Sequence, residues 1–196
     1  MIFLALAGCA LPLPDKPVRP QPYDLGPALP AAAAAQPAGP ALALEPVVAP
    51  AAIDGTQILY RLAYAGGGQQ PRPYAQARWT MAPPQLVTQR LREALSARRP
   101  VVEAGTGLAP LELRAELDEF THVFGAPDAS EGVVRLRVTA TAPAARTGRL
   151  LGQRTFTVRQ PAATADAPGG AAALRAATDE VARQVAAWVD GLPAPR

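Results

Sequence analysis

The sequence predicts a two-layer α+β domain, in which one mixed or antiparallel β-sheet carries two helices on a single face. Apolar and charged residues alternate at 111–118 and 134–140, as in strands with one buried face. Apolar residues at helical spacing mark two amphipathic segments, 83–98 and 170–189. The patterns follow one another in the order β-β-β-α-β-β-β-α, and the simplest arrangement is one sheet covered by both helices.

The first three strands are expected in the N-terminal half of the domain. Residues 41–48 read as a strand with Pro46 at an edge or bulge. Residues 57–64 form the next strand, a loop starts at Gly66, and residues 74–79 return as a third. The second and third strands therefore predict a β-hairpin with a long tip.

The first helix is expected to start at Pro83 and to stop before Pro100. The last helix carries an apolar stripe that ends before Gly191 and Pro193. One further short strand is expected at 155–158, between the central strands and this helix.

The two central strands are expected to pair with each other. Acids lie on the polar side of 111–118 and arginines on that of 134–140, so an antiparallel hairpin would bring opposite charges together. Phe120 follows Leu117 after three residues, which breaks the alternation and indicates a bulge. The charged face of the sheet is expected to be solvated or used for contacts.

The chain begins with a short apolar stretch whose last residues are Leu6, Ala7 and Gly8. Cys9 follows and is the only cysteine of the chain. This pattern resembles the lipobox of bacterial lipoproteins, in which the cysteine becomes lipidated and N-terminal after cleavage. The apolar stretch is short and no basic residue precedes Lys16, so either the true start lies upstream or Cys9 is an ordinary buried thiol. The first reading is favoured, and Ala10 favours sorting to the outer membrane.

The chain therefore divides into a signal peptide truncated at its start (1–8), a lipidated N-terminus and tether (9–40), and a folded domain (41–192). The tether is rich in proline and alanine, which favours extended, semi-rigid backbone. Within it, Tyr23–Gly26 is an island of other composition that could dock on the domain as an edge strand.

No residue pattern for catalysis, a cofactor or a metal is found. His122 is the only histidine and is interpreted as a structural or surface residue. Phosphate-binding and zinc-binding motifs do not occur. The chain has a net charge of +3, but its arginines are spread among acids, which argues against nucleic acid.

Aromatic residues near the predicted hairpin are the candidate contact residues. Tyr60, Tyr64, Tyr74 and Trp79 are proposed to form an exposed patch that binds a partner, although Trp79 is also a natural core residue.

Several stretches resemble, in order and spacing, the ABC-type transport auxiliary lipoproteins, the family that includes paraquat-inducible protein C. The matching stretches are 23–26, 59–64, 74–79 with 84–86, 117–120 with Phe124, 132–137, and the last helix.

The resemblance implies a non-enzymatic lipoprotein at the periplasmic face of the outer membrane, which belongs to a lipid-transport system. Its partners would be a periplasmic protein with a mammalian-cell-entry (MCE) domain, an inner-membrane permease and an ATPase, with phospholipid as the cargo. The family fold is similar to the N-terminal domain of TolB. A homo-oligomer is compatible with this role, but the residues do not set the number of subunits.

An alternative of another class is a lipoprotein that activates a peptidoglycan synthase from the outer membrane. Some of these activators carry a similar domain on a Pro-rich tether. The residues from Tyr60 to Trp79 favour the transport reading.

Overall fold

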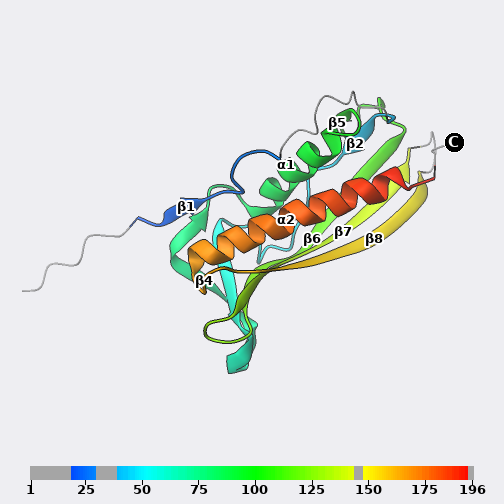
Figure 1. Ribbon diagram of the computed structural model, residues 1–196. Coiled ribbons are helices and arrows are strands. Elements are labelled where there is room, and N and C mark those ends of the chain that lie inside the picture. Colours follow the sequence, from blue (N-terminus) through cyan, green and yellow to red (C-terminus); the bar gives the residue numbers. More distant parts are fainter. Residues whose placement is uncertain (1–18, 30–38, 144–147, 194–196) are drawn as a thin grey trace, which may run out of the picture.

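The computed structural model describes residues 19–29, 39–143 and 148–193, and these form one mixed sheet of eight strands covered by two helices (Figure 1). The predicted fold class is confirmed. The strands are β1 (Gln21–Tyr23), β2 (Leu42–Leu44), β3 (Gln57–Leu62), β4 (Gly67–Trp79), β5 (Val101–Glu103), β6 (Leu111–Phe124), β7 (Ser130–Ala142) and β8 (Arg149–Pro161). The helices are α1 (Pro83–Ser96) and α2 (Ala167–Asp190), and a 3-10 turn, η1 (Ala63–Ala65), joins β3 to β4.

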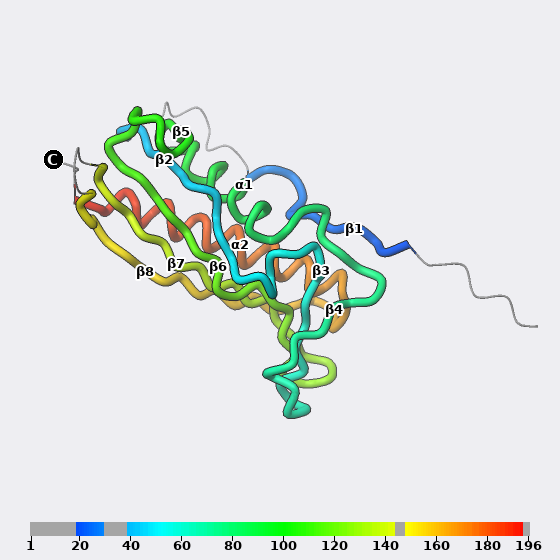
Figure 2. Tube along the Cα trace, turned by 180° about the vertical axis from the view of Figure 1, so that it is seen from behind, coloured from blue at the N-terminus to red at the C-terminus, as the bar shows by residue number. Residues whose placement is uncertain are grey.

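The long strand β6 organises the sheet. On one side it pairs with β7 in antiparallel fashion along its whole length, and β8 pairs in turn with β7. On its other side β6 pairs in parallel with β2 near its start and with β3 near its end. Seen from behind, the sheet lies in front of the helices, so its second face has no helical cover (Figure 2).

The expected pairing of the two central strands is confirmed. Glu116 lies opposite Arg137, and their side chains form an ion pair with an N–O distance of 2.7 Å. Arg137 also reaches Asp118 at 3.3 Å. The bulge is present as a register shift between Leu117 and Glu119. It keeps Phe120 on the buried side of β6, although Phe120 is an odd number of residues from Leu117.

Helix α2 lies on the sheet at a place where the sheet has no side chain. A Cβ atom added at Gly132 of β7 would be 2.5 Å from the backbone nitrogen of Leu174. The glycine therefore allows the helix backbone to approach the strand closely. Leu174, Val181 and Val185 of α2 are fully buried against this surface.

The hairpin of β3 and β4 differs from its prediction. Strand β4 begins at Gly67 instead of 74, so Gly67 and Gly68 lie inside the strand, and η1 with Gly66 makes the tip. Pro71 and Pro73 are tolerated because β1 flanks β4 only from Ala77 to Trp79, which leaves one side of the strand free at the prolines.

The island in the expected tether is part of the sheet, as predicted. Gln21–Tyr23 pair in parallel with Ala77–Trp79, and Leu25 is buried. Arg90 of α1, itself 2% exposed, donates to the carbonyl oxygens of Leu25 and Pro27. Residues 19–29 therefore belong to the folded part, and the boundary expected at 40/41 is too late for them.

The lipobox residues Leu6, Ala7 and Gly8 and the lipidation residue Cys9 lie outside the described residues. In the part of the chain that is described, no helix is long and apolar enough to cross a bilayer.

Candidate contact surfaces at the two ends of the domain

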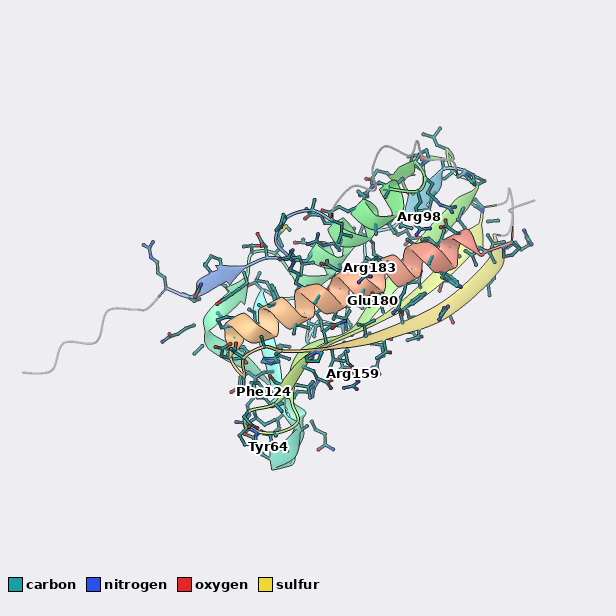
Figure 3. All side chains as sticks on the ribbon, in the orientation of Figure 1. Tyr64, Arg98, Phe124, Arg159, Glu180 and Arg183 are labelled. Atoms are coloured by element: carbon teal, nitrogen blue, oxygen red, sulfur yellow. The ribbon has the colours of Figure 1, made fainter. Side chains whose placement is uncertain are left out.

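The sheet gives the domain two distinct ends. The first, called here the hairpin end, contains the tip of the β3–β4 hairpin, the β6–β7 turn (125–129) and the start of α2. Figure 3 shows Tyr64 at the projecting tip and Phe124 closer to the body of the domain. The opposite end contains the loop 104–110, the start of β8 and the end of α2, with Arg98 beside them.

An aromatic cluster fixes the base of the hairpin to the sheet. The rings of Tyr60 and Tyr74 lie 4.7 Å apart, on adjacent strands of the hairpin. Tyr60 also contacts Phe124 of β6, edge to face at 5.9 Å. The Tyr74 hydroxyl and His122 Nδ1 are 2.8 Å apart, within hydrogen-bond distance. Because these contacts join three strands, the hairpin is a supported projection and not a loose loop.

His122 is enclosed at the centre of this cluster. Its side chain is 0% exposed, and the start of α2 covers it at Gly170, where an added Cβ would be 2.3 Å from His122 Nδ1. Burial lowers the pKa of His122, which favours the neutral imidazole, and the Asp166 carboxylate opposes this weakly. Burial also raises the pKa of Tyr74. Both side chains are thus neutral. In the histidine tautomer that carries its proton on Nε2, the Tyr74 hydroxyl donates a hydrogen bond to Nδ1.

The arrangement gives His122 a structural role. A general base needs access to a substrate proton, and this ring is closed off by Tyr74, Phe124 and α2. Of the two roles expected for His122, structural or on the surface, the structure supports the structural one, because the side chain is buried. From the sequence, His122 was expected at the end of a strand, and the local pattern there does not indicate whether the side chain is buried.

Of the four aromatic residues expected to form one exposed patch, Trp79 does not belong to it. Its side chain is 1% exposed and packs edge to face on Phe120, at 5.4 Å between ring centroids. The reason is that Trp79 lies on the face of β4 that packs into the hydrophobic core, where β1 flanks its strand. Tyr60 and Tyr74 are half-buried, and Tyr64 at the tip is 47% exposed.

The opposite end carries two exposed leucines that sequence reasoning did not single out. Leu108 is 70% exposed and lies just before β6, whereas Leu150 is 62% exposed at the start of β8. Both lie near the same end of the strands, because Glu112 pairs with Thr141 and Thr141 pairs with Leu150. Burial is decided by the tertiary fold, and no local pattern in the sequence separates these leucines from core leucines.

Two hollows lie near the hairpin end. A cavity of about 790 Å³ separates β1 from the first half of α2, with Tyr23, Arg175 and Asp179 among its lining residues. A second, of about 480 Å³, lies between Ala63, Val123 and Arg159. Among residues 19–29, 39–143 and 148–193, no group of three His, Cys, Asp or Glu side chains is placed to hold a metal ion.

A family model places the chain in a known class of proteins. The family model described as "ABC-type transport auxiliary lipoprotein component" matches residues 23–186. The chain therefore belongs to the ABC-type transport auxiliary lipoproteins. A search of curated proteins found no match.

Solved structures share the fold at low sequence identity. A Xanthomonas campestris protein is 18% identical with a TM-score of 0.74, and the match covers 86% of this chain and 94% of that one. A hypothetical protein of Chlamydia trachomatis is 11% identical with a TM-score of 0.56, over 79% and 97% of the two chains. Both matches extend over nearly the whole of the other protein, so the domain is the shared unit.

Proposed function

We propose that this protein is the outer-membrane lipoprotein subunit of an ABC transport system that moves lipid, and that it docks the periplasmic MCE protein of that system. The observation that carries the proposal is the family match over residues 23–186, which assigns the chain to transport auxiliary lipoproteins. The permease and the ATPase of the system would supply transport and energy. The role of this domain is then binding, and it needs no reaction of its own.

The anchor of the proposed protein is lipidated Cys9. Acyl chains on one N-terminal cysteine hold a soluble domain at a membrane surface without a spanning helix. Cys9 and Arg19 are ten positions apart, and a fully extended chain of that length spans at most about 35 Å. Since β1 and Arg90 hold residues 21–27 on the domain, the stretch between the anchor and the domain is much shorter than residues 9–40.

A short tether at one end leaves the other end of the domain for the partner. The exposed side chains of Leu108 and Leu150 supply the apolar contact area that a docking site for a protein partner requires. Ion pairs rigidify this end, because Arg98 and Arg99 both bind Asp190 at the end of α2. We therefore propose that the MCE protein docks at the opposite end, near these leucines.

The test is a crosslinked purification of the lipidated protein from native membranes, with mass spectrometry of the proteins recovered. Recovery of an MCE protein with its permease, lost when Cys9→Ala removes the anchor, is the expected result. Recovery of a penicillin-binding protein without an MCE protein would contradict the proposal and favour activation of a peptidoglycan synthase.

The docking surface is tested by Leu108→Asp with Leu150→Asp. This double variant should lose the MCE protein while its unfolding midpoint stays within a few degrees, because both side chains are exposed. Met81→Asp is the matched control, since Met81 is another exposed apolar residue, between β4 and α1. Equal recovery with the double variant and the control would remove the opposite end as the docking site.

A further inference from the structure

We propose that the β3–β4 hairpin, with Tyr64 at its tip, rests on the anionic phospholipid surface of the membrane that holds the anchor. The hairpin thus contacts the layer of lipid headgroups and not the MCE protein. The inference rests on the lipid anchor of the proposed function. It adds a second, non-covalent contact that sets the orientation of the domain.

The charge of the hairpin fits an anionic surface. Between Asp54 and Glu93 the sequence has no acidic residue, and the hairpin itself carries Arg61, Arg72 and Arg78. The partners of the first two are neutral, because Arg61 donates to the carbonyl oxygen of Gly68 at 2.9 Å and Arg72 to the Gln70 side chain at 3.1 Å. Their charge is therefore available to phosphate oxygens.

The neighbouring turn does not cancel this charge. The β6–β7 turn, residues 125–129, adds a single acid, Asp128. At the adjoining ends of β7 and β8, Glu131 is already paired with Arg159. The start of α2 adds Asp166, so the positive charge of this end is confined to the hairpin itself, which carries arginines and no acid.

The side chains of the tip suit the boundary between headgroups and water. Tyr64 is exposed on a 3-10 turn that ends in Gly66, whose positive φ of 68° closes the turn. Tyrosine has an apolar ring and a polar hydroxyl and is enriched at membrane interfaces for that reason. Ala63 and Ala65 flank it, so no large polar side chain of the turn blocks its approach.

The path of the chain brings the anchor to the same end. Strand β1 runs parallel to β4, which itself starts at the tip, so the chain before Gln21 leaves the sheet toward the hairpin end. Figure 1 shows β1, the start of α2 and the hairpin on one side of the molecule, away from the C-terminal side. With ten positions from Cys9 to Arg19, the point where the chain joins β1 stays within about 35 Å of the bilayer, on the side of the domain from which the hairpin projects.

The hairpin is also held in place before it meets the surface. The contacts of Tyr60 with Tyr74 and Phe124, and of Tyr74 with His122, fix its base on β6. A supported hairpin loses little conformational freedom on contact, so a few weak interactions are sufficient once the anchor keeps it close.

The test uses the full-length lipidated protein, reconstituted in vesicles. Cys9 is the only native cysteine and its thiol is consumed by lipidation, so Ala65→Cys and Leu108→Cys each provide one site for a fluorophore. Quenching by a nitroxide-labelled headgroup should be strong at position 65 and weak at 108. At position 65 it should be stronger in phosphatidylcholine mixed with phosphatidylglycerol than in phosphatidylcholine alone, and it should decrease with salt.

Charge variants locate the contact. Arg61→Gln with Arg72→Gln should weaken the phosphatidylglycerol-dependent part of the quenching at position 65 by about fivefold for each arginine. The matched control is Arg114→Gln with Arg149→Gln, which changes the net charge equally at two exposed arginines outside the hairpin. The control should keep the quenching of the wild-type protein.

Three outcomes would overturn the inference. Equal quenching at positions 65 and 108 would show that the hairpin does not face the membrane. Equal loss in the two arginine pairs would show attraction by net charge alone. Weak quenching at 65, together with crosslinking of the hairpin to the MCE protein, would assign it to a protein partner. A protein whose N-terminus carries no acyl chains by mass spectrometry would instead contradict the proposed anchor.

Discussion

At the scale of single residues, His122 provides a clean test because it is the only histidine of the chain. Burial lowers its pKa in the folded state below the ordinary value of about 6.5, so the unfolded chain binds the proton more tightly. Stability from this residue is therefore present at neutral pH and is lost as the pH falls below about 6.5 toward the lower folded pKa.

The measurement is the free energy of unfolding in urea at a series of pH values between about 7.5 and 5. His122→Asn keeps a group that can accept from the Tyr74 hydroxyl but does not titrate, so it should flatten the decrease in this range. An unchanged slope in the variant would contradict the assignment of the pH dependence to this ring.

Gly170 shows why the histidine and the start of α2 fit together. In Gly170→Ala the new methyl group would be 2.3 Å from His122 Nδ1, so the helix or the ring has to move. Overpacking of this kind costs about 1–3 kcal/mol. Gly55→Ala is the control, because an added Cβ at Gly55 meets nothing within 4 Å. Thermal unfolding of both variants checks the difference, and equal midpoints would contradict it.

Single contacts of this kind were beyond the reach of sequence reasoning. Tyr74 and His122 are 48 positions apart, and nothing in either local pattern indicates that they meet. Trp79 was included among the possible contact residues although a core position was also expected for it, and the structure places its indole in the core against Phe120.

At the scale of elements, Arg90 joins the first folded segment to both helices. Its guanidinium contacts the carbonyl oxygens of Leu25 and Pro27, Glu93 at 3.0 Å and Asp179 of α2 at 3.1 Å. Removing one partner of a buried ion pair leaves the others unpaired and costs about 3–5 kcal/mol. We expect Arg90→Met to lower the free energy of unfolding by about this amount.

The same variant should release the segment that precedes the domain. Hydrogen exchange at residues 23–29 should become faster in Arg90→Met than in Arg92→Met. Arg92 is the control because its ion pair with Glu103 is partly exposed and is worth under about 1 kcal/mol. Equal protection of residues 23–29 in the two variants would show that β1 pairing alone holds the segment.

The elements that sequence reasoning found are those with a strong periodic signal. The alternation in β6 and β7 predicted their pairing, their charge contacts and their bulge, because one face is apolar and the other charged. Strand β4 starts earlier than expected since its glycines and prolines are signals of a loop. Strand β8 is an edge strand whose side chains are mostly exposed. Only the part around Phe156 and Val158 was therefore recognised as a strand, at 155–158.

At the scale of the whole molecule, we propose that one end of the domain faces the membrane and the other end faces the partner. The proposed anchor lies toward the first end, where the hairpin projects with arginines and Tyr64. The second presents Leu108 and Leu150. Family membership establishes a transport accessory lipoprotein, and this polarity is the proposed way in which it works.

The most direct test of this polarity is photocrosslinking in native membranes, with the reactive amino acid placed at Leu108 in one protein and at Ala65 in another. We expect position 108 to capture the MCE protein, whereas position 65 captures phospholipid and no MCE protein. Capture of the MCE protein at position 65 and not at position 108 would contradict this polarity.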